Sequence, residues 1–236
     1  MKTLLATALG TVLFTSTAQA ATFVDTREAL NPNDFLDWSE LVEVPEDLVG
    51  PPLPTLPNPF SATSPGGLNL NVSIPAGEFA RIDQTPFFPG AFDVGDGLLF
   101  TGLGNPGPLT ITFDTPVFGV GTQVQSDPIE IFDYIATIEA FDSLGNSLGS
   151  FERPGVSEIN AGGGVIFTGV FDSSGDIKTL VLNAKEEGVD VPFAINALSI
   201  RSVPISVPEP SVILGLLVIG GTGSIVSRLR GLPENN

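Results

Sequence analysis

The chain has 236 residues, of which 42% are hydrophobic and 15% are charged, so it can form one domain of ordinary size with terminal segments, or two very small domains. Nine basic residues against 27 acidic ones give a formal net charge of −18, which excludes a basic surface of the kind that binds nucleic acid. The chain has no His and no Cys, which excludes imidazole catalysis, Cys nucleophiles, zinc sites of the usual ligands and disulfides. Carboxylate chemistry remains, as Ca²⁺ or Mg²⁺ sites and paired-carboxylate glycosidases.

Residues 1–20 have the pattern of a secretory signal peptide. Met1 and Lys2 give a positive start, an apolar stretch follows, and Ala18-Gln19-Ala20 is the small-x-small pattern that signal peptidase cuts after. We therefore expect an exported chain that begins at Ala21. The alternative, a short buried N-terminal helix, leaves the small and hydroxyl residues before position 21 unexplained.

Residues 21–66 form an acidic segment rich in proline. The run of prolines over 51–59 cannot pair as a central strand. The stretch 33–41 predicts a short helix capped by Asn33. The helix would place three apolar side chains on one side: Phe35, Trp38 and Leu41. We expect this segment to be a lid or a first edge of the fold, with a disordered arm as the alternative.

Residues 67–203 predict a β-sandwich domain. Over 68–74 apolar and polar residues alternate with a period of two, as in a half-buried strand. Further strands are expected over 98–100, 109–113, 117–124, 134–142, 147–151, 165–171, 179–182 and 194–201. Short strands without a long helix predict an all-β fold, an antiparallel β-sandwich of the jelly-roll type.

The C-terminal region predicts a short transmembrane helix over about 211–227. Residues 212–226 carry no charge and are followed by Arg228 and Arg230, which the positive-inside tendency keeps on the cytoplasmic side. A soluble core helix is the alternative.

Pro208, Glu209 and Pro210 stand directly before this apolar segment. Over 204–236 the order of Pro-Glu-Pro, apolar helix and arginines resembles the PEP-CTERM sorting signal of Gram-negative bacteria. The resemblance implies that a membrane enzyme, exosortase, recognises the signal and removes the helix. The protein would then pass from a transient anchor in the cytoplasmic membrane to the cell surface or the extracellular matrix. A rigid linker before an ordinary anchor is the alternative.

The middle of the chain also resembles the β-sandwich domain often found ahead of PEP-CTERM tails. The similar stretches are 113–123, 136–146, 167–170 and 193–200. The resemblance implies a galactose-binding-like sandwich, a fold whose members often bind sugars. The last strand of such domains typically reads Phe-x-Ile-Asp-Asn-Leu, and this chain departs from it at Asn196 and Ala197.

Two kinds of candidate ligand site occur in the predicted loops. Asp93 and Asp96 are spaced by three and flanked by glycines, as in a fragment of a Ca²⁺ loop. The similar acidic loops at 142–146 and 172–176 are expected to be hairpin turns. Phe87 and Phe88 stand between prolines and could form a stacking platform for sugars, whereas most other phenylalanines are expected in the core.

These patterns favour an exported, exosortase-sorted surface or matrix protein without catalytic activity. Its expected partners are signal peptidase, exosortase and an exopolysaccharide or surface glycan, with Ca²⁺ as the candidate cofactor. One alternative is a carboxylate-dependent glycan hydrolase or lyase, for which the available carboxylates are Glu130, Asp133, Glu139 and Glu158. Another is a purely structural matrix component.

Overall fold

The computed structural model describes residues 20–44, 53–85, 90–102, 104–126, 132–158 and 165–203. Several predicted features lie outside these ranges: the signal helix with Ala18, the pair Phe87 and Phe88, Glu130, and the sorting signal with Pro208, Glu209, Pro210, Arg228 and Arg230. In the part of the chain that is described, no helix is long and apolar enough to cross a membrane.

The described residues form two antiparallel sheets with almost no helix, which confirms the predicted antiparallel β-sandwich. Sheet A contains β1 (Thr22–Val24), β2 (Asp34–Leu36), β3 (Thr55–Leu56), β6 (Phe79–Asp83), β7 (Gly97–Phe100), β9 (Gly119–Ser126), β12 (Ile166–Phe171), β15 (Phe193–Ile195) and β16 (Leu198–Arg201). Sheet B contains β4 (Phe60–Thr63), β5 (Asn69–Ser73), β8 (Leu109–Val117), β10 (Asp133–Phe141), β11 (Ser147–Val156), β13 (Ile177–Glu186) and β14 (Val189–Asp190). The short helices are α1 (Arg27–Leu30) and the 3-10 turn η1 (Trp38–Glu40).

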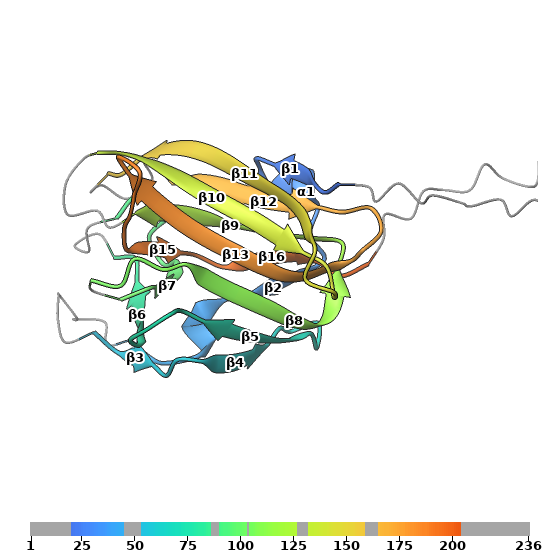
Figure 1. Cartoon of the computed structure of the whole chain (residues 1–236). Coiled ribbons are helices and arrows are strands. Elements are labelled where there is room, and N and C mark those ends of the chain that lie inside the picture. Colours follow the sequence, from blue (N-terminus) through green and yellow to red (C-terminus); the bar gives the residue numbers. More distant parts are fainter. Residues whose placement is uncertain are drawn as a thin grey trace, which may run out of the picture. The chain divides into compact units, whose positions relative to one another are not determined.

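Sheet B runs in the order β11-β10-β13-β8-β5-β4, and Figure 1 shows these strands following one another down the view. Its strands alternate as a sheet with one face in the core does. In β8, Leu109, Ile111 and Phe113 are fully buried, while the intervening Thr110 and Thr112 are partly exposed. The inward residues of β10, β13 and β5 join the same core cluster. The outward face of sheet B therefore remains accessible to solvent.

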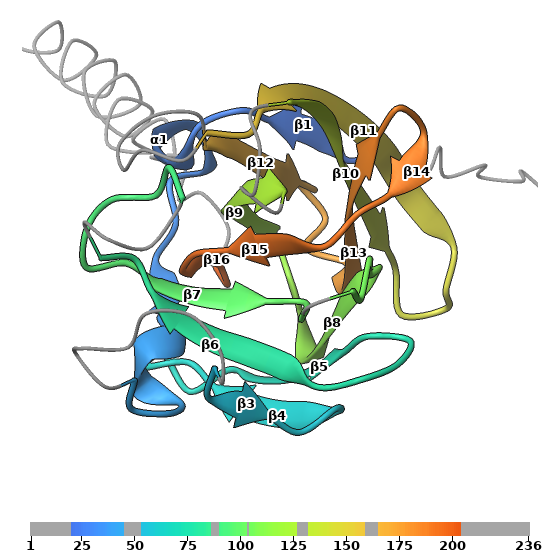
Figure 2. The same cartoon turned by 90° about the vertical axis from the view of Figure 1, so that its left-hand side faces the viewer.

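The strands β6, β7, β9 and β16 of sheet A are buried on both faces. Figure 2 shows β15, β7 and β6 side by side, and all four residues of β7 are buried. A second apolar cluster packs Phe92, from the loop after β6, against residues of β6 and β7. A third joins Leu30 of α1 with Phe167 of β12. Loop and helix residues thus cover the outer side of sheet A, so the two sheets present different surfaces.

The acidic N-terminal segment supplies strands to both sheets. β1 forms an edge of sheet A, where it pairs with β12, and β4 forms an edge of sheet B, where it pairs with β5. The sandwich therefore begins before residue 67. The interpretation of the segment as a first edge of the fold agrees with this pairing.

The helix predicted over residues 33–41 is wrong. Asp34–Leu36 instead forms β2 and pairs with β16, and only Trp38–Glu40 turns, with Asp37 as its N-cap. Phe35 is 43% exposed, whereas Trp38 is fully buried, so the three-residue spacing does not define one face. The reason is tertiary, because β16 offers backbone pairing and a core position for Leu36 that no local pattern reveals.

The loop at 142–146 is the predicted hairpin turn, since it joins the paired strands β10 and β11. The loop at 172–176 is not a hairpin, because it joins β12 of sheet A to β13 of sheet B. Asp172 nevertheless has the expected turn chemistry, since its carboxylate accepts the Asp176 amide at 3.0 Å. A local turn pattern specifies the chain reversal but not the sheet that the next strand joins.

Candidate functional site

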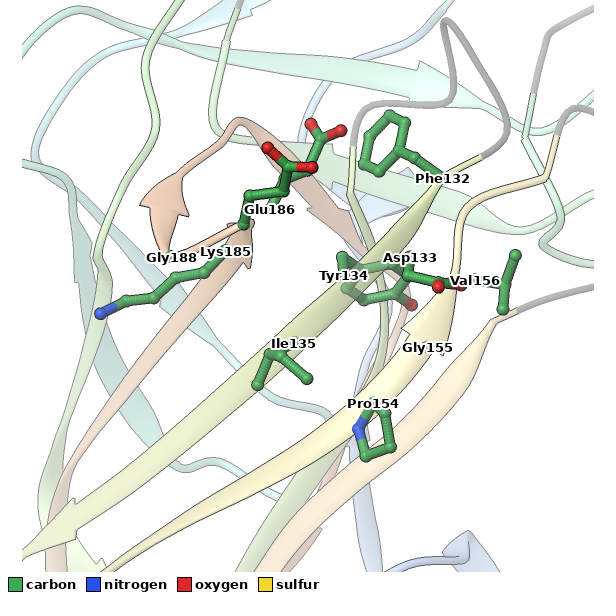
Figure 3. A pocket seen from close by; sticks show the side chains of 11 residues that line it. Phe132, Asp133, Tyr134, Ile135, Pro154, Gly155, Val156, Lys185, Glu186 and Gly188 are labelled. Carbon is green, nitrogen blue, oxygen red and sulfur yellow. The ribbon is translucent and has the colours of Figure 1, made fainter.

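A hollow of about 660 Å³ lies where three strands of sheet B end. It is lined by the start of β10, the end of β11, the end of β13 and the tight turn after β13. The side chains drawn in Figure 3 are those of Phe132, Asp133, Tyr134, Ile135, Pro154, Val156, Lys185, Glu186 and Glu187, together with Gly155 and Gly188. The volume is within the range of small-ligand pockets.

The floor of the hollow is apolar and partly exposed. Ile135 is 36% exposed and Val156 40% exposed, and Ile135 lies directly opposite Pro154 in the pairing of β10 with β11. Phe132 stands at the rim (Figure 3), where its carbonyl accepts the Ser157 amide at 2.8 Å. Ile135, Pro154 and Val156 therefore offer apolar contact surface that the core does not use, whereas Phe132 also packs against the core.

Tyr134 and Gly155 support this floor from below. The two residues are paired across β10 and β11, and a Cβ atom at position 155 would lie 2.5 Å from the Tyr134 ring. The Tyr134 hydroxyl points inward and donates to the Val124 carbonyl at 2.7 Å. Burial raises the pKa of this phenol well above its ordinary value, although the charge of Arg153 and a backbone hydrogen bond at Ile166 oppose that rise. Glycine at 155 is thus required for the close approach of the ring.

The rim of the hollow is acidic. Asp133, Glu186 and Glu187 line it, and among the described residues no hydrogen bond or ion pair is present for these three carboxylates. The lining's cation, Lys185, lies 3.8 Å from Asp190, and in Figure 3 its side chain extends away from Phe132. The carboxylates are therefore not neutralised by the lining.

The turn after β13 holds the carboxylate of Glu187 at the hollow. Glu187 has a φ of 48° and Gly188 a φ of 83°, the positive values that two-residue type I′ turns require. Glutamate is uncommon in this conformation. The sequence analysis missed Glu186 and Glu187. The signal that could have found them is the pair Glu-Gly between two predicted β segments, which marks a tight turn.

The predicted Ca²⁺ ligands Asp93 and Asp96 lie in the loop between β6 and β7. The Asp96 amide donates to the Asp93 carbonyl at 3.0 Å, which closes a tight turn. The Asp96 carboxylate accepts the amide of Asn196 at 3.0 Å, while Asp93 is exposed. Within the described ranges, no group of three or more His, Cys, Asp or Glu is placed to hold a metal ion. The structure thus brings Asp96 to an amide partner, and Ca²⁺ binding here stays a prediction.

Asn196, one of the two departures from the sandwich-domain pattern, has a structural role. Its side-chain oxygen accepts the Gln123 amide at 3.1 Å, and its amide donates to Asp96 and to the Gln123 side chain. Its backbone carbonyl accepts the indole N–H of Trp38 at 2.7 Å. The residue is almost fully buried and joins β9, the loop before β7 and the segment around η1.

The candidate catalytic carboxylates are dispersed. Asp133 lines the hollow, whereas Glu139 lies on the outward face of β10 and accepts the Ser147 hydroxyl at 3.1 Å. Glu158 follows β11, and its backbone carbonyl accepts the Gln125 side chain at 2.7 Å. The carboxylates that accompany Asp133 in the hollow are instead Glu186 and Glu187.

The predicted cleavage site adjoins the first buried residue that the structure describes. Ala20 is exposed, whereas Ala21 is 6% exposed and its amide donates to the Leu148 carbonyl at 2.8 Å. A chain that begins at Ala21 would retain this contact.

Comparison with known proteins gives distant fold likenesses. No protein-family model matches the chain, and no curated protein does. Among solved structures, a DUF4465 family protein from Bacteroides caccae aligns with 16% identity and a TM-score of 0.40, over 72% of this chain and 100% of that one. The enzymatically active domain of tailspike protein 4 from bacteriophage CBA120 aligns with 13% identity and a TM-score of 0.29, over 56% of this chain and 19% of that one. The CBM22-1–GH10 modules of a Clostridium thermocellum xylanase, complexed with xylohexaose, align with 10% identity and a TM-score of 0.28, over 57% and 28%.

Proposed function

We propose that this chain is an exported, exosortase-sorted protein of the cell surface or extracellular matrix, whose β-sandwich associates with an exopolysaccharide without cleaving it. The finer fold that we propose for the sandwich is a jelly roll of the galactose-binding-like kind. The observation that carries the binding proposal is the hollow on sheet B, which combines an apolar floor with an uncompensated polar rim.

The proposal of export depends on the two ends of the sequence. The small-x-small pattern ends at Ala20, and the Ala21 amide already donates a hydrogen bond to the Leu148 carbonyl. At the other end, Pro-Glu-Pro, an apolar segment and two arginines stand in the order of a PEP-CTERM signal. Mass spectrometry of the protein released by the producing cell tests both, because the proposal requires a chain that begins at Ala21 and lacks the residues after the Pro-Glu-Pro motif.

Binding is tested by a pull-down with the native exopolysaccharide, once with Ca²⁺ and once with EDTA, while reducing sugars are measured. Retention without sugar release supports a non-catalytic binding role, and retention only with Ca²⁺ supports the predicted metal dependence. Release of reducing sugars would instead support the glycan hydrolase alternative. A protein retained in neither buffer would contradict glycan association and favour the purely structural alternative.

A further inference from the structure

Arg201, the last residue of β16, is a buried cation without an ion pair. The neighbouring Ile200 packs into the main core cluster, so the side chain of Arg201 points to the outer side of sheet A. Arg201 is 5% exposed, and no carboxylate of the described residues forms an ion pair with it. Burying a charge costs free energy unless an opposite charge compensates it. The described part of the chain therefore lacks a counter-charge for this arginine.

Arg81 shows how completely an arginine is paired elsewhere in the same fold. It is 1% exposed, and each of its three guanidinium nitrogens has an acceptor. Nε donates to the Trp38 carbonyl at 2.8 Å, and Nη1 donates to the Ile82 carbonyl. Nη2 donates to the Asp83 carboxylate at 2.5 Å, which also supplies the opposite charge. Arg81 thus has the full set of partners that a buried guanidinium group requires.

One edge of the Arg201 guanidinium group, in contrast, is without acceptors. Nη1 donates to the Leu30 carbonyl at 3.2 Å and to the Asn31 carbonyl at 2.9 Å. Nε is buried and has no hydrogen-bond partner among the described residues, and no hydrogen bond from Nη2 is formed within them. The Phe171 ring, whose centroid lies 5.9 Å from the guanidinium carbon, helps to hold the group in place. Nε and Nη2 share the free edge, and such an edge of a planar fork can bind two oxygens side by side.

Arg27 brings a second unpaired cation to the same turn of the chain. It is the first residue of α1 and, at a spacing of three, shares the helix face of Leu30, which is buried. The Nη2 atom of Arg27 is also buried without a hydrogen-bond partner among the described residues. The Asn31 amide donates to the Arg27 carbonyl at 3.1 Å, while the Asn31 carbonyl accepts from Arg201. The two arginines therefore approach one short segment, and each has a buried donor to spare.

The free edge of Arg201 fits a carboxylate better than a phosphate. A carboxylate places its two oxygens on two parallel N–H donors, the bidentate geometry of arginine pairs. A phosphate has further oxygens, and each of them loses water on burial unless it also finds a donor. Asp25 and Glu28 flank Arg27 in the chain, are exposed and form no ion pair among the described residues. Their charges disfavour a ligand that carries two negative charges.

We propose that the Nε–Nη2 edge of Arg201 binds a carboxylate group of a ligand, and that Arg27 adds a second positive charge to the site. Neither arginine lines the hollow of sheet B, so this site goes beyond the proposed function and does not depend on it. The carboxylate can come from a uronic acid or from an acidic peptide, and the test separates these two sources.

The test is NMR spectroscopy of the isotope-labelled full chain in a mild non-ionic detergent, in which the arginine Nε–H signals are followed. Arg201→Lys identifies the Arg201 signal, because it removes that signal. The probes are a galacturonate trisaccharide, its neutral methyl ester, a glutamate tripeptide and inorganic phosphate. At least one of the two acids is expected to shift the Arg201 Nε–H signal, because its carboxylate accepts from Nε. The ester is expected to leave the signal in place, because it has lost the charge.

Arg27→Gln tests the site without changing the buried fork, and it keeps the proposal testable if Arg201→Lys does not fold. It is expected to weaken binding of the acid about fivefold, the effect of one partly exposed charge. Lys178→Gln is the matched control, because it removes one positive charge from β13 of sheet B, where the ammonium group donates to the Asp114 carbonyl. The control is expected to leave binding unchanged. Folding of each variant is checked by the fluorescence of Trp38, the one tryptophan of the chain.

Failure of both acids to bind, or an equal response to the methyl ester, would overturn the inference. Equal weakening by Arg27→Gln and Lys178→Gln would show a general charge effect and would also overturn the site. Phosphate binding more tightly than both acids would refute the assignment to a carboxylate. Binding of the trisaccharide alone would support the site with a uronic acid as its ligand, and binding of the tripeptide alone would support it with an acidic peptide.

Discussion

Replacing Asn196 by Asp isolates the effect of burying a carboxylate next to Asp96. In the native protein the Asn196 amide donates to Asp96 at 3.0 Å and to the Gln123 side chain. Asn196→Asp keeps the size and the accepting oxygen, but it exchanges the donor for a second negative charge. Both Asp96 and Gln123 would then face an acceptor.

The cost follows from this geometry. Two unit charges about 3 Å apart repel by about 5 kcal/mol at an effective dielectric constant of about 20. Each lost hydrogen bond adds about 1 kcal/mol, and relaxation or uptake of a proton relieves part of the sum. We expect Asn196→Asp to lower the free energy of unfolding by about 4 kcal/mol at neutral pH. The loss should shrink as the pH falls, because a proton shared between the carboxylates removes the repulsion.

Asn183→Asp is the matched control. Asn183 also donates to an aspartate, Asp190, at 2.8 Å, but this pair is partly exposed on the outer face of sheet B and Lys185 lies nearby. Solvent screens such a pair, so we expect a loss below about 1 kcal/mol. The assay is urea unfolding followed by Trp38 fluorescence. Equal losses in the two variants, or a loss at Asn196 below 1 kcal/mol, would refute the assignment of a buried structural role to Asn196.

Three further predictions concern the support of the hollow and the β10–β11 hairpin. The chain has one tyrosine, so its absorbance on alkaline titration reports Tyr134 alone. Because burial raises its folded pKa, the native protein should show no ionisation near pH 10, where the urea-unfolded chain titrates. The stability gained from the buried neutral phenol is present below the pKa of the unfolded chain and is lost as the pH rises through the pKa of the folded protein. If the native protein ionised with the same midpoint pH as the unfolded chain, the result would contradict the burial of Tyr134. Gly155→Ala places a methyl group 2.5 Å from the Tyr134 ring. It should lower the free energy of unfolding by about 3 kcal/mol, because the site becomes overpacked and the hydrogen bond from the Tyr134 hydroxyl to Val124 is strained. An unchanged urea midpoint would show that the ring moves aside without cost. Hydrogen bonds from the Asn146 side chain and backbone lower the pKa of Asp142, so Asn146→Ala should raise that pKa toward its ordinary value, as measured by NMR titration. A carboxylate whose pKa is lowered by folding contributes stability that is lost as the pH falls through that pKa. The variant should therefore lose less stability than the native protein on acidification. An unchanged pKa of Asp142 in the variant would count against this turn geometry.

The sequence predicted those parts of the fold that depend on local patterns. Alternation over 68–74 corresponds to β5, where Leu70 and Val72 enter the core, and the segment 142–146, with its Asp, Gly and Asn, forms the turn of β10 and β11. A period of two and the conformational needs of tight turns are properties of neighbouring residues. They can therefore be inferred without knowledge of the partners of each strand.

Features that depend on distant residues could not be inferred in this way. β2 forms because β16, more than 160 residues away in the chain, pairs with it. β6 was missed because it is buried on both faces and shows no alternation. In each case the free energy comes from contacts that exist only after the sheets have assembled.

The candidate site shows the same division. The sequence by itself determined that the chain is acidic and limited to carboxylate chemistry, and it predicted the β-sandwich, because charge and composition are sums over the chain and the period of two is a property of neighbouring residues. Only the tertiary structure decided that Asp133, Glu186 and Glu187 line one hollow and that Asp96 accepts a hydrogen bond from Asn196. The physical reason is that strand order and register place residues about 50 or 100 positions apart beside each other, and both are set by the packing of the whole sandwich.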